Sequence, residues 1–219
     1  MLENQNKQDL TVLELTEADH PILAHSGSEN VLSSMSLLAR ALMGTSVDGP
    51  DTFQSFLKQY HRDVLLPLEL PILYQAYCHA AHSRVRELID LDLSLTEEPL
   101  FQLFARNSER IGKSRLKQLE SLKEQRCIQR YLKAVDRKDA FGWHLIVHGI
   151  SLAVYSKPVC QGLVHYAHFS VRALMHSAAD AFPTDTVIDP ADLDRFSEQS
   201  LAAVKSIIAS TEASSISIC

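Results

Sequence analysis

The sequence has little glycine, with seven residues among 219. Strict alternation of apolar and polar residues, the pattern of a half-buried strand, is also rare. Apolar residues instead recur at spacings of three and four along most of the chain, which is the pattern of an amphipathic helix. The sequence therefore predicts an all-α fold, a single-domain helical bundle of roughly eight to ten helices.

Other absences narrow the class of protein. The four cysteines lie far apart and form no C-x-x-C pair, which argues against a zinc knuckle or a dithiol redox motif. No apolar run reaches the roughly 18 residues that span a bilayer, and MLENQNKQDL at the start lacks the build of a signal peptide. The formal net charge is −6, so there is no basic field for nucleic acid or anionic lipid. We expect a cytoplasmic protein without nucleic-acid or membrane partners.

Helix boundaries follow from prolines, capping residues and polar breaks. Pro67 and Pro71 are tolerated only in a first helical turn, which predicts a new helix from Pro67 or Leu70 to about Ser83. A charged connector is expected before Trp143. The other predicted helices cover residues 29–43, 51–64, 85–95, 96–123, 143–155, 158–182 and 190–208. We expect the helical domain to span residues 20–210, between a flexible lead, residues 1–19, and a flexible tail, residues 211–219.

Ten histidines raise the alternative of a helical metal- or haem-dependent enzyme. His144 and His148 are spaced i, i+4, but HLIVH lacks the glutamate of the metalloprotease motif. A second set of residues recurs at spacings of three and four on one predicted helix: His165, His168, Arg172 and His176. His168 and His176 lie too far apart along a helix to bind one metal ion, and the positive charge of Arg172 between them would repel it. We therefore predict no metal, no cofactor and no catalytic residue, and keep the enzyme as the alternative.

Ser108 and Gly112 are spaced i, i+4 within a predicted helix. Glycine inside a helix costs about 1 kcal/mol against alanine, so a small-residue pair there predicts the close approach of another helix. Near the N-terminus, PILAHSGSEN (residues 21–30) has the proline, serines and acid of a helix entry. A catalytic pair of His25 and Ser26 is not expected, because adjacent side chains rarely point at one another.

Five short motifs follow one another along the chain. PILAHSGSEN is the first, ELPIL (Glu69–Leu73) the second, and LDLSL the third, with a serine and a glycine 16 and 20 residues after its aspartate. WHLIVHG and SAADAFPTD complete the series. The residues that carry it are His25, Ser26, Gly27, Glu29, Pro71, Asp92, Ser108, Gly112, His144, Gly149, Ser177, Ala178 and Ala179.

In this order the motifs resemble those of UreF, an all-helical family of urease accessory proteins. The family patterns run roughly L-P-x-G-G-F-x-H-S-x-G-L-E, D-L-P-L-L, L-D-x-x-L with S-x-x-x-G, H-H-x-x-x-F-G and S-A-A-x-R-L-x-P-L-G-Q. This chain lacks the Gly-Gly pair, has Trp143 where the family has the first histidine, and lacks the arginine and P-L-G-Q after Ala179. The resemblance covers about residues 20–208.

The resemblance implies a non-enzymatic scaffold that forms a homodimer, binds a UreD/UreH-type accessory protein and recruits a UreG-type GTPase. Together they assist nickel insertion into apo-urease. The motif residues are then candidates for family contacts, and Tyr166, Phe169 and Arg172 are candidate anchors, because aromatic residues and arginine dominate interface energetics. A UreF-like module with another client is a further alternative.

Overall fold

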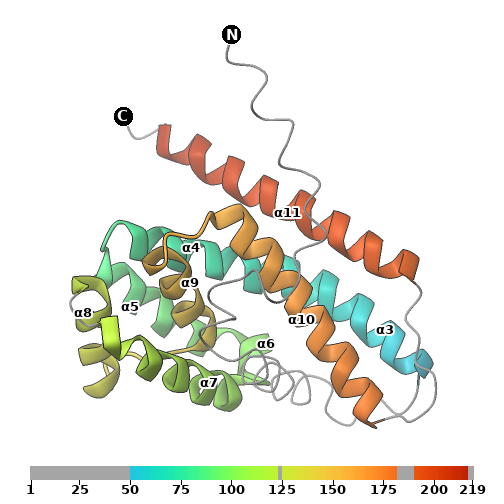
Figure 1. Ribbon diagram of the computed structural model, residues 1–219, viewed down its shortest axis with the longest axis horizontal. Helices are drawn as coiled ribbons and strands as arrows, with labels where there is room; N and C mark the ends of the chain where they lie inside the picture. The colour runs from blue at the N-terminus through green and yellow to red at the C-terminus, as the bar shows by residue number, and fades with distance from the viewer. Residues whose placement is uncertain (1–49, 123–124, 182–189, 217–219) are drawn as a thin grey trace.

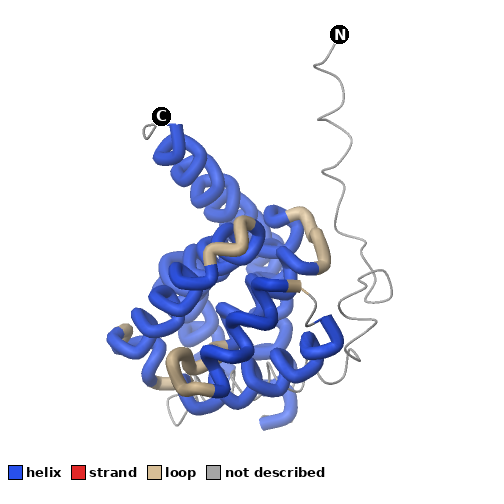
Figure 2. The backbone as a smooth tube through the Cα atoms, turned by 90° about the vertical axis from the view of Figure 1, so that its left-hand side faces the viewer, coloured by secondary structure: helices blue, strands red, loops and turns tan. Residues whose placement is uncertain are grey.

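The computed structural model describes residues 50–122, 125–181 and 190–216. Within these ranges the regular structure is helical and contains no strand (Figure 2), which confirms the predicted all-α fold. The predicted helix over residues 29–43 lies outside the described residues, and no helix in the described part is long and apolar enough to cross a membrane. The α-helices are α3 (Pro50–Tyr60), α4 (Leu70–Ala81), α5 (Val85–Ser94), α6 (Pro99–Gln102), α7 (Ala105–Gln118), α8 (Arg126–Asp136), α9 (His144–Val154), α10 (Val159–Ala181) and α11 (Pro190–Ile216).

Helices α3 and α4 form one long rod, joined by the π-helical segment η2 (His61–Glu69) (Figure 1). The predicted break between Val64 and Leu70 is therefore wrong. In a π-helix the backbone partner shifts from i−4 to i−5, as in the bond from the Leu70 N–H to the Leu65 carbonyl. This wider winding lets the chain pass Pro67 without leaving the helical path.

The helix predicted from residue 96 to residue 123 is broken. The chain forms the 3₁₀ turn η3 (Leu95–Glu97), the short α6, α7 and the 3₁₀ turn η4 (Leu119–Leu122). Phe104, just before α7, has a non-helical φ of −126°. The break places Phe101 and Phe104 together in the core, with ring centroids 4.8 Å apart.

Two other boundaries differ from the prediction. Helix α8 occupies much of the stretch that was expected to be a connector, because four residues at helical spacing are buried: Cys127, Ile128, Tyr131 and Ala134. The charged residues that made the segment resemble a connector lie largely on the opposite, exposed side. Helix α11 continues to Ile216, eight residues beyond its predicted end.

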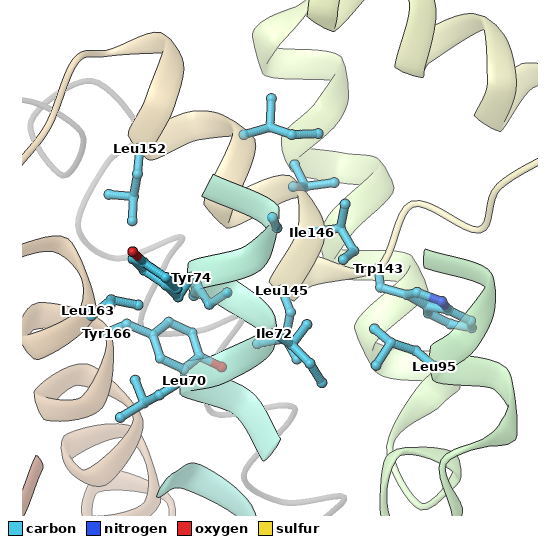
Figure 3. Packing of buried hydrophobic residues seen from close by; sticks show 14 of the residues in the cluster. Leu70, Ile72, Tyr74, Leu95, Trp143, Leu145, Ile146, Leu152, Leu163 and Tyr166 are labelled. Atoms are coloured by element: carbon cyan, nitrogen blue, oxygen red, sulfur yellow. The ribbon is translucent and has the colours of Figure 1, made fainter. Parts of the chain in front are cut away.

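Helix α9 lies at the centre of the bundle, packed against α4 on one side and α7 on the other. Its buried apolar residues point in several directions, as expected for a helix enclosed by protein; they are Leu145, Ile146, Val147, Ile150 and Leu152. Figure 3 shows Leu145 beside Ile72 of α4, with Leu163 and Tyr166 of α10 on the opposite side of α4. Helix α10 packs against α11.

Candidate functional site

Ser108 of α7 and His144 of α9 are joined in the core, although 36 residues separate them in the chain. The Ser108 Oγ lies 2.8 Å from the His144 Nδ1 and accepts the backbone N–H of His144 at 3.2 Å. The serine therefore holds both the ring of His144 and the first turn of α9. Both side chains are buried.

The chain of hydrogen bonds continues from His144 to Glu69. The His144 Nε2 lies 3.0 Å from the Tyr166 hydroxyl oxygen, and the Tyr166 O–H donates to the Glu69 Oε2 at 3.2 Å. Tyr60 donates to the same carboxylate oxygen at 2.8 Å. Because Tyr166 donates to Glu69, its oxygen accepts from the Nε2–H of His144, which leaves the Nδ1 to accept from Ser108.

We call these five side chains the Glu69–His144 chain: Tyr60, Glu69, Tyr166, His144 and Ser108. All five are buried. Burial, followed by the positive charge of Arg115, lowers the pKa of His144 to about 3, so its imidazole is neutral at physiological pH. Burial raises the pKa of Glu69 to about 7, against the opposing effect of its bonds from Tyr60 and Tyr166. Glu69 is thus the titratable member of this group near neutral pH.

The free energy of unfolding should therefore fall as pH rises from about 4.5 to about 7, and Glu69→Gln should remove that fall. A carboxyl whose pKa is raised by folding stabilises the protein below its ordinary pKa near 4.5, and this contribution is lost as pH rises through about 7. We expect the free energy of unfolding to drop by about 3 kcal/mol more in the wild type than in Glu69→Gln between pH 4.5 and pH 8. Urea unfolding across this range measures both curves.

Glu120→Gln, at an exposed position in η4, is the matched control and should follow the wild-type curve. Parallel curves for the wild type and Glu69→Gln would show that ionisation of Glu69 does not couple to folding.

Asp92 forms a second buried centre, at the segment that leads into α9. Its side chain is 0% exposed. The Tyr131 O–H donates to its carboxylate at 2.6 Å, as do the backbone N–H groups of Phe141 at 2.6 Å, Gly142 at 3.1 Å and Trp143 at 3.3 Å. Burial raises the pKa of Asp92, and these four donors oppose the rise. One carboxylate thus fixes α8 and the entry to α9 relative to α5.

Trp143 extends the Asp92 centre through its indole ring. The Nε1–H donates to the backbone carbonyl of Asp92 at 2.7 Å. The ring stacks on Phe141, with centroids 4.7 Å apart, and meets the edge of Phe101 at 5.1 Å. The residue that replaces the first histidine of the family pattern is therefore a structural contact.

Gly112 and Gly149 set the separation between α9 and its neighbours. A Cβ at Gly112 would collide with the Gly142 carbonyl oxygen and lie 2.8 Å from the His144 nitrogen. A Cβ at Gly149 would lie 2.7 Å from the Ala76 Cβ and 2.9 Å from the Leu73 carbonyl oxygen of α4. The predicted close approach at Gly112 is present, and the partner is the backbone that enters α9.

The other sequence candidates lie in several places. Tyr166 is buried, Phe169 is half-buried and Arg172 is exposed, all on α10. Pro71 is half-buried in the first turn of α4. Ser177, Ala178 and Ala179 lie on the last turns of α10, and His25, Ser26, Gly27 and Glu29 lie outside the described residues. The buried motif residues thus lie in the core, whereas Phe169 and Arg172 lie nearer the surface.

Several important contacts were not predicted. Glu69 was predicted only as part of the ELPIL motif. A carboxylate within the apolar run LLPLELPIL nevertheless indicates a buried polar contact, because a charge in an apolar run needs partners. His61 was not among the residues singled out from the sequence. Its Nε2 lies 3.0 Å from the Ser200 Oγ of α11, and its ring lies 4.8 Å from that of Phe196. His61 therefore ties η2 to α11.

Two of the histidines that suggested a metal site, His144 and His148, have other contacts. His144 has both ring nitrogens within the Glu69–His144 chain, and the His148 Nδ1 lies 3.0 Å from the Arg115 Nη1. In the described part of the chain, no three His, Cys, Asp or Glu side chains gather as a metal site would require. The contacts described for His144, Asp92 and Glu69 all hold helices together.

The chain matches the model of a known protein family. The model of the UreF family matches residues 47–185, which is more than half of the chain and includes α3 to α10. None of the curated proteins compared with the chain matches it.

Proposed function

Because the chain belongs to the UreF family of urease accessory proteins, we propose that it is a non-enzymatic scaffold in urease maturation. It binds a UreD/UreH-type accessory protein and recruits a UreG-type GTPase, and this assembly inserts nickel into apo-urease. The protein acts in the cytoplasm as a homodimer. The family match over residues 47–185 is the observation that carries the proposal.

The interior supports a role as a rigid platform. Asp92, Ser108 and His144 are hydrogen-bonded to partners on other segments of the bundle, and Gly112 and Gly149 fix the distances between helices. A scaffold holds its partners best when its own surfaces do not have to rearrange on binding, because ordering costs reduce affinity.

Co-purification tests the proposal directly. A tagged form of the protein should retain a UreD/UreH homologue when the two are expressed together. It should retain a UreG homologue only when the UreD/UreH homologue is also present. Nickel content and urease activity of the coexpressed urease should rise with the complete set. Failure to retain either partner while the protein remains folded would remove the urease role and favour a UreF-like module with another client.

The outer face of α10, defined by His168, Phe169 and Arg172, is a proposed contact for these partners. Arg172 and His168 are exposed, and the Phe169 ring lies 6.4 Å from those of His165 and His168. An arginine beside a half-buried aromatic ring is a typical interface anchor.

Arg172→Ala should weaken binding of the UreD/UreH homologue about tenfold, as expected for loss of an interface arginine. Titration by isothermal calorimetry measures the change. Arg106→Ala, at an exposed position of α7, is the matched control and should bind within about twofold of the wild type. Equal affinities for both variants would exclude Arg172 from the interface.

A further inference from the structure

A groove of about 530 Å³ lies between the start of α5 and the second half of α8. The two helices pack side by side (Figure 1). This volume is within the range of pockets that hold a small ligand or a few side chains of a partner. None of the residues of the Asp92 centre or the Glu69–His144 chain lines it.

The groove is strongly basic. Three of its cations recur at spacings of three and four, two on α8 and one directly after it: Arg130, Lys133 and Arg137. The other two lie directly before α5 and in its first turn: Arg84 and Arg86. All five side chains are exposed. The lining also contains Glu87 and Asp139, so the balance is five positive against two negative charges, or +3. Over the whole chain the formal charge is −6.

These five cations lack ion-pair partners among the described residues, since no ion pair there joins any of them to a carboxylate. Like charges placed close together repel, and the repulsion destabilises the protein unless an anion offsets it. The arrangement therefore favours a negatively charged occupant.

The backbone at both ends of the groove is held in place. Ser83 and Lys138 have positive φ values of 55° and 65°. The Arg84 N–H donates to the His79 carbonyl at 2.8 Å, and the Asp139 N–H donates to the Ala134 carbonyl at 2.8 Å. The backbone that carries the cationic side chains is thus fixed before a ligand binds, which lowers the entropic cost of ordering the site on binding.

The groove also has an apolar component. Val85 and Ala134 are buried and Ile89 is half-buried, and all three line it. A simple anion such as phosphate makes no use of these side chains. A short polypeptide segment with both acidic and apolar side chains can contact the cations and the apolar residues together.

We propose that the groove between α5 and α8 binds an acidic segment of a partner protein, with carboxylates on the five cations and apolar side chains against Val85, Ile89 and Ala134. Nucleic acid fits less well, because Glu87, Asp139 and the overall negative charge oppose a continuous phosphate backbone. The inference is independent of the proposed role in urease maturation, because it requires only that some partner carries such a segment.

A labelled peptide tests the inference on the full chain. The probe is a fluorescein-labelled peptide of about eight residues, mostly Glu and Asp with two leucines, followed by fluorescence anisotropy at low salt. The wild type should bind it saturably, and binding should weaken as salt is raised. A peptide with Gln and Asn in place of the acids should bind at least tenfold more weakly.

Paired charge reversals locate the site. The double variant Arg130→Glu/Lys133→Glu should bind the acidic peptide at least tenfold more weakly than the wild type. The control Arg106→Glu/Lys117→Glu makes the same change in net charge at exposed positions of α7 and should bind within about threefold of the wild type. Thermal unfolding followed by circular dichroism verifies that both variants fold.

Equal weakening by both double variants would overturn the proposal, since it would reflect net charge alone. Equal binding of the acidic and amide peptides to the wild type would overturn it without recourse to any variant. A single-stranded oligonucleotide of matched charge that binds more tightly than the peptide would assign the groove to nucleic acid, and pyrophosphate that binds more tightly would assign it to a small anion.

Discussion

Gly112→Ala should destabilise the protein by about 3 kcal/mol, although alanine is the better helix former. In a solvent-exposed helix the change would stabilise by about 1 kcal/mol. Here the new Cβ would meet the Gly142 carbonyl oxygen and the backbone of Trp143 and His144. That backbone is held by Asp92 and Ser108, so it cannot retreat without losing these bonds. Urea unfolding measures the difference.

Gly162→Ala is the control for this prediction, because that glycine is also buried in a helix. Its added Cβ would meet the Leu152 Cδ1 at 2.7 Å and Cδ2 at 2.8 Å, which are the ends of a flexible side chain. A rotamer change can relieve this contact, so the net effect should stay below about 1 kcal/mol. If the two variants lose equal stability, the rigid backbone that leads into α9 is not the reason why position 112 requires glycine.

Fold class and several helices could be predicted from the sequence, because apolar spacing records which face of a helix is buried. Helix α5, predicted as 85–95, and α9, predicted as 143–155, differ little from the structure. The π-helical segment could not be predicted in this way. Pro67 has no backbone N–H and cannot form the i to i−4 hydrogen bond of an α-helix. Only the tertiary contacts of α3, η2 and α4 decide that a π-helical turn is lower in free energy there than a break in the helix.

The members of the buried centres were partly predictable, but their partners were not. The spacing of Asp92, Ser108 and Gly112 identified three of the residues involved, since the family motifs contain them. The apolar run around Glu69 indicates that its carboxylate needs a partner, but nothing local identifies that partner as Tyr166. Nothing local to Tyr131 indicates its bond to Asp92. Such pairs arise when segments distant in sequence meet, which helical periodicity does not encode.

Asp92→Ala should be among the most destabilising single changes, with a loss of about 4 kcal/mol. It leaves the Tyr131 O–H and the N–H groups of Phe141, Gly142 and Trp143 without their acceptor, in a place that water does not reach freely. Buried donors without partners each cost about 1–3 kcal/mol, less what a rearranged chain can recover. Urea unfolding gives the size of the loss.

Trp143 is the chain's single tryptophan and donates to the Asp92 carbonyl, so its fluorescence reports on the same place. A red shift in Asp92→Ala, before global unfolding, should show the entry to α9 opening to water. Asp90→Ala, at an exposed position of the same helix, is the control, and we expect a change within about 0.5 kcal/mol and an unchanged spectrum. Asp92→Asn retains one acceptor oxygen and should fall between the two, since an amide cannot accept all four bonds. A stability for Asp92→Ala close to that of Asp90→Ala would mean that the helices around α9 are held by apolar packing alone.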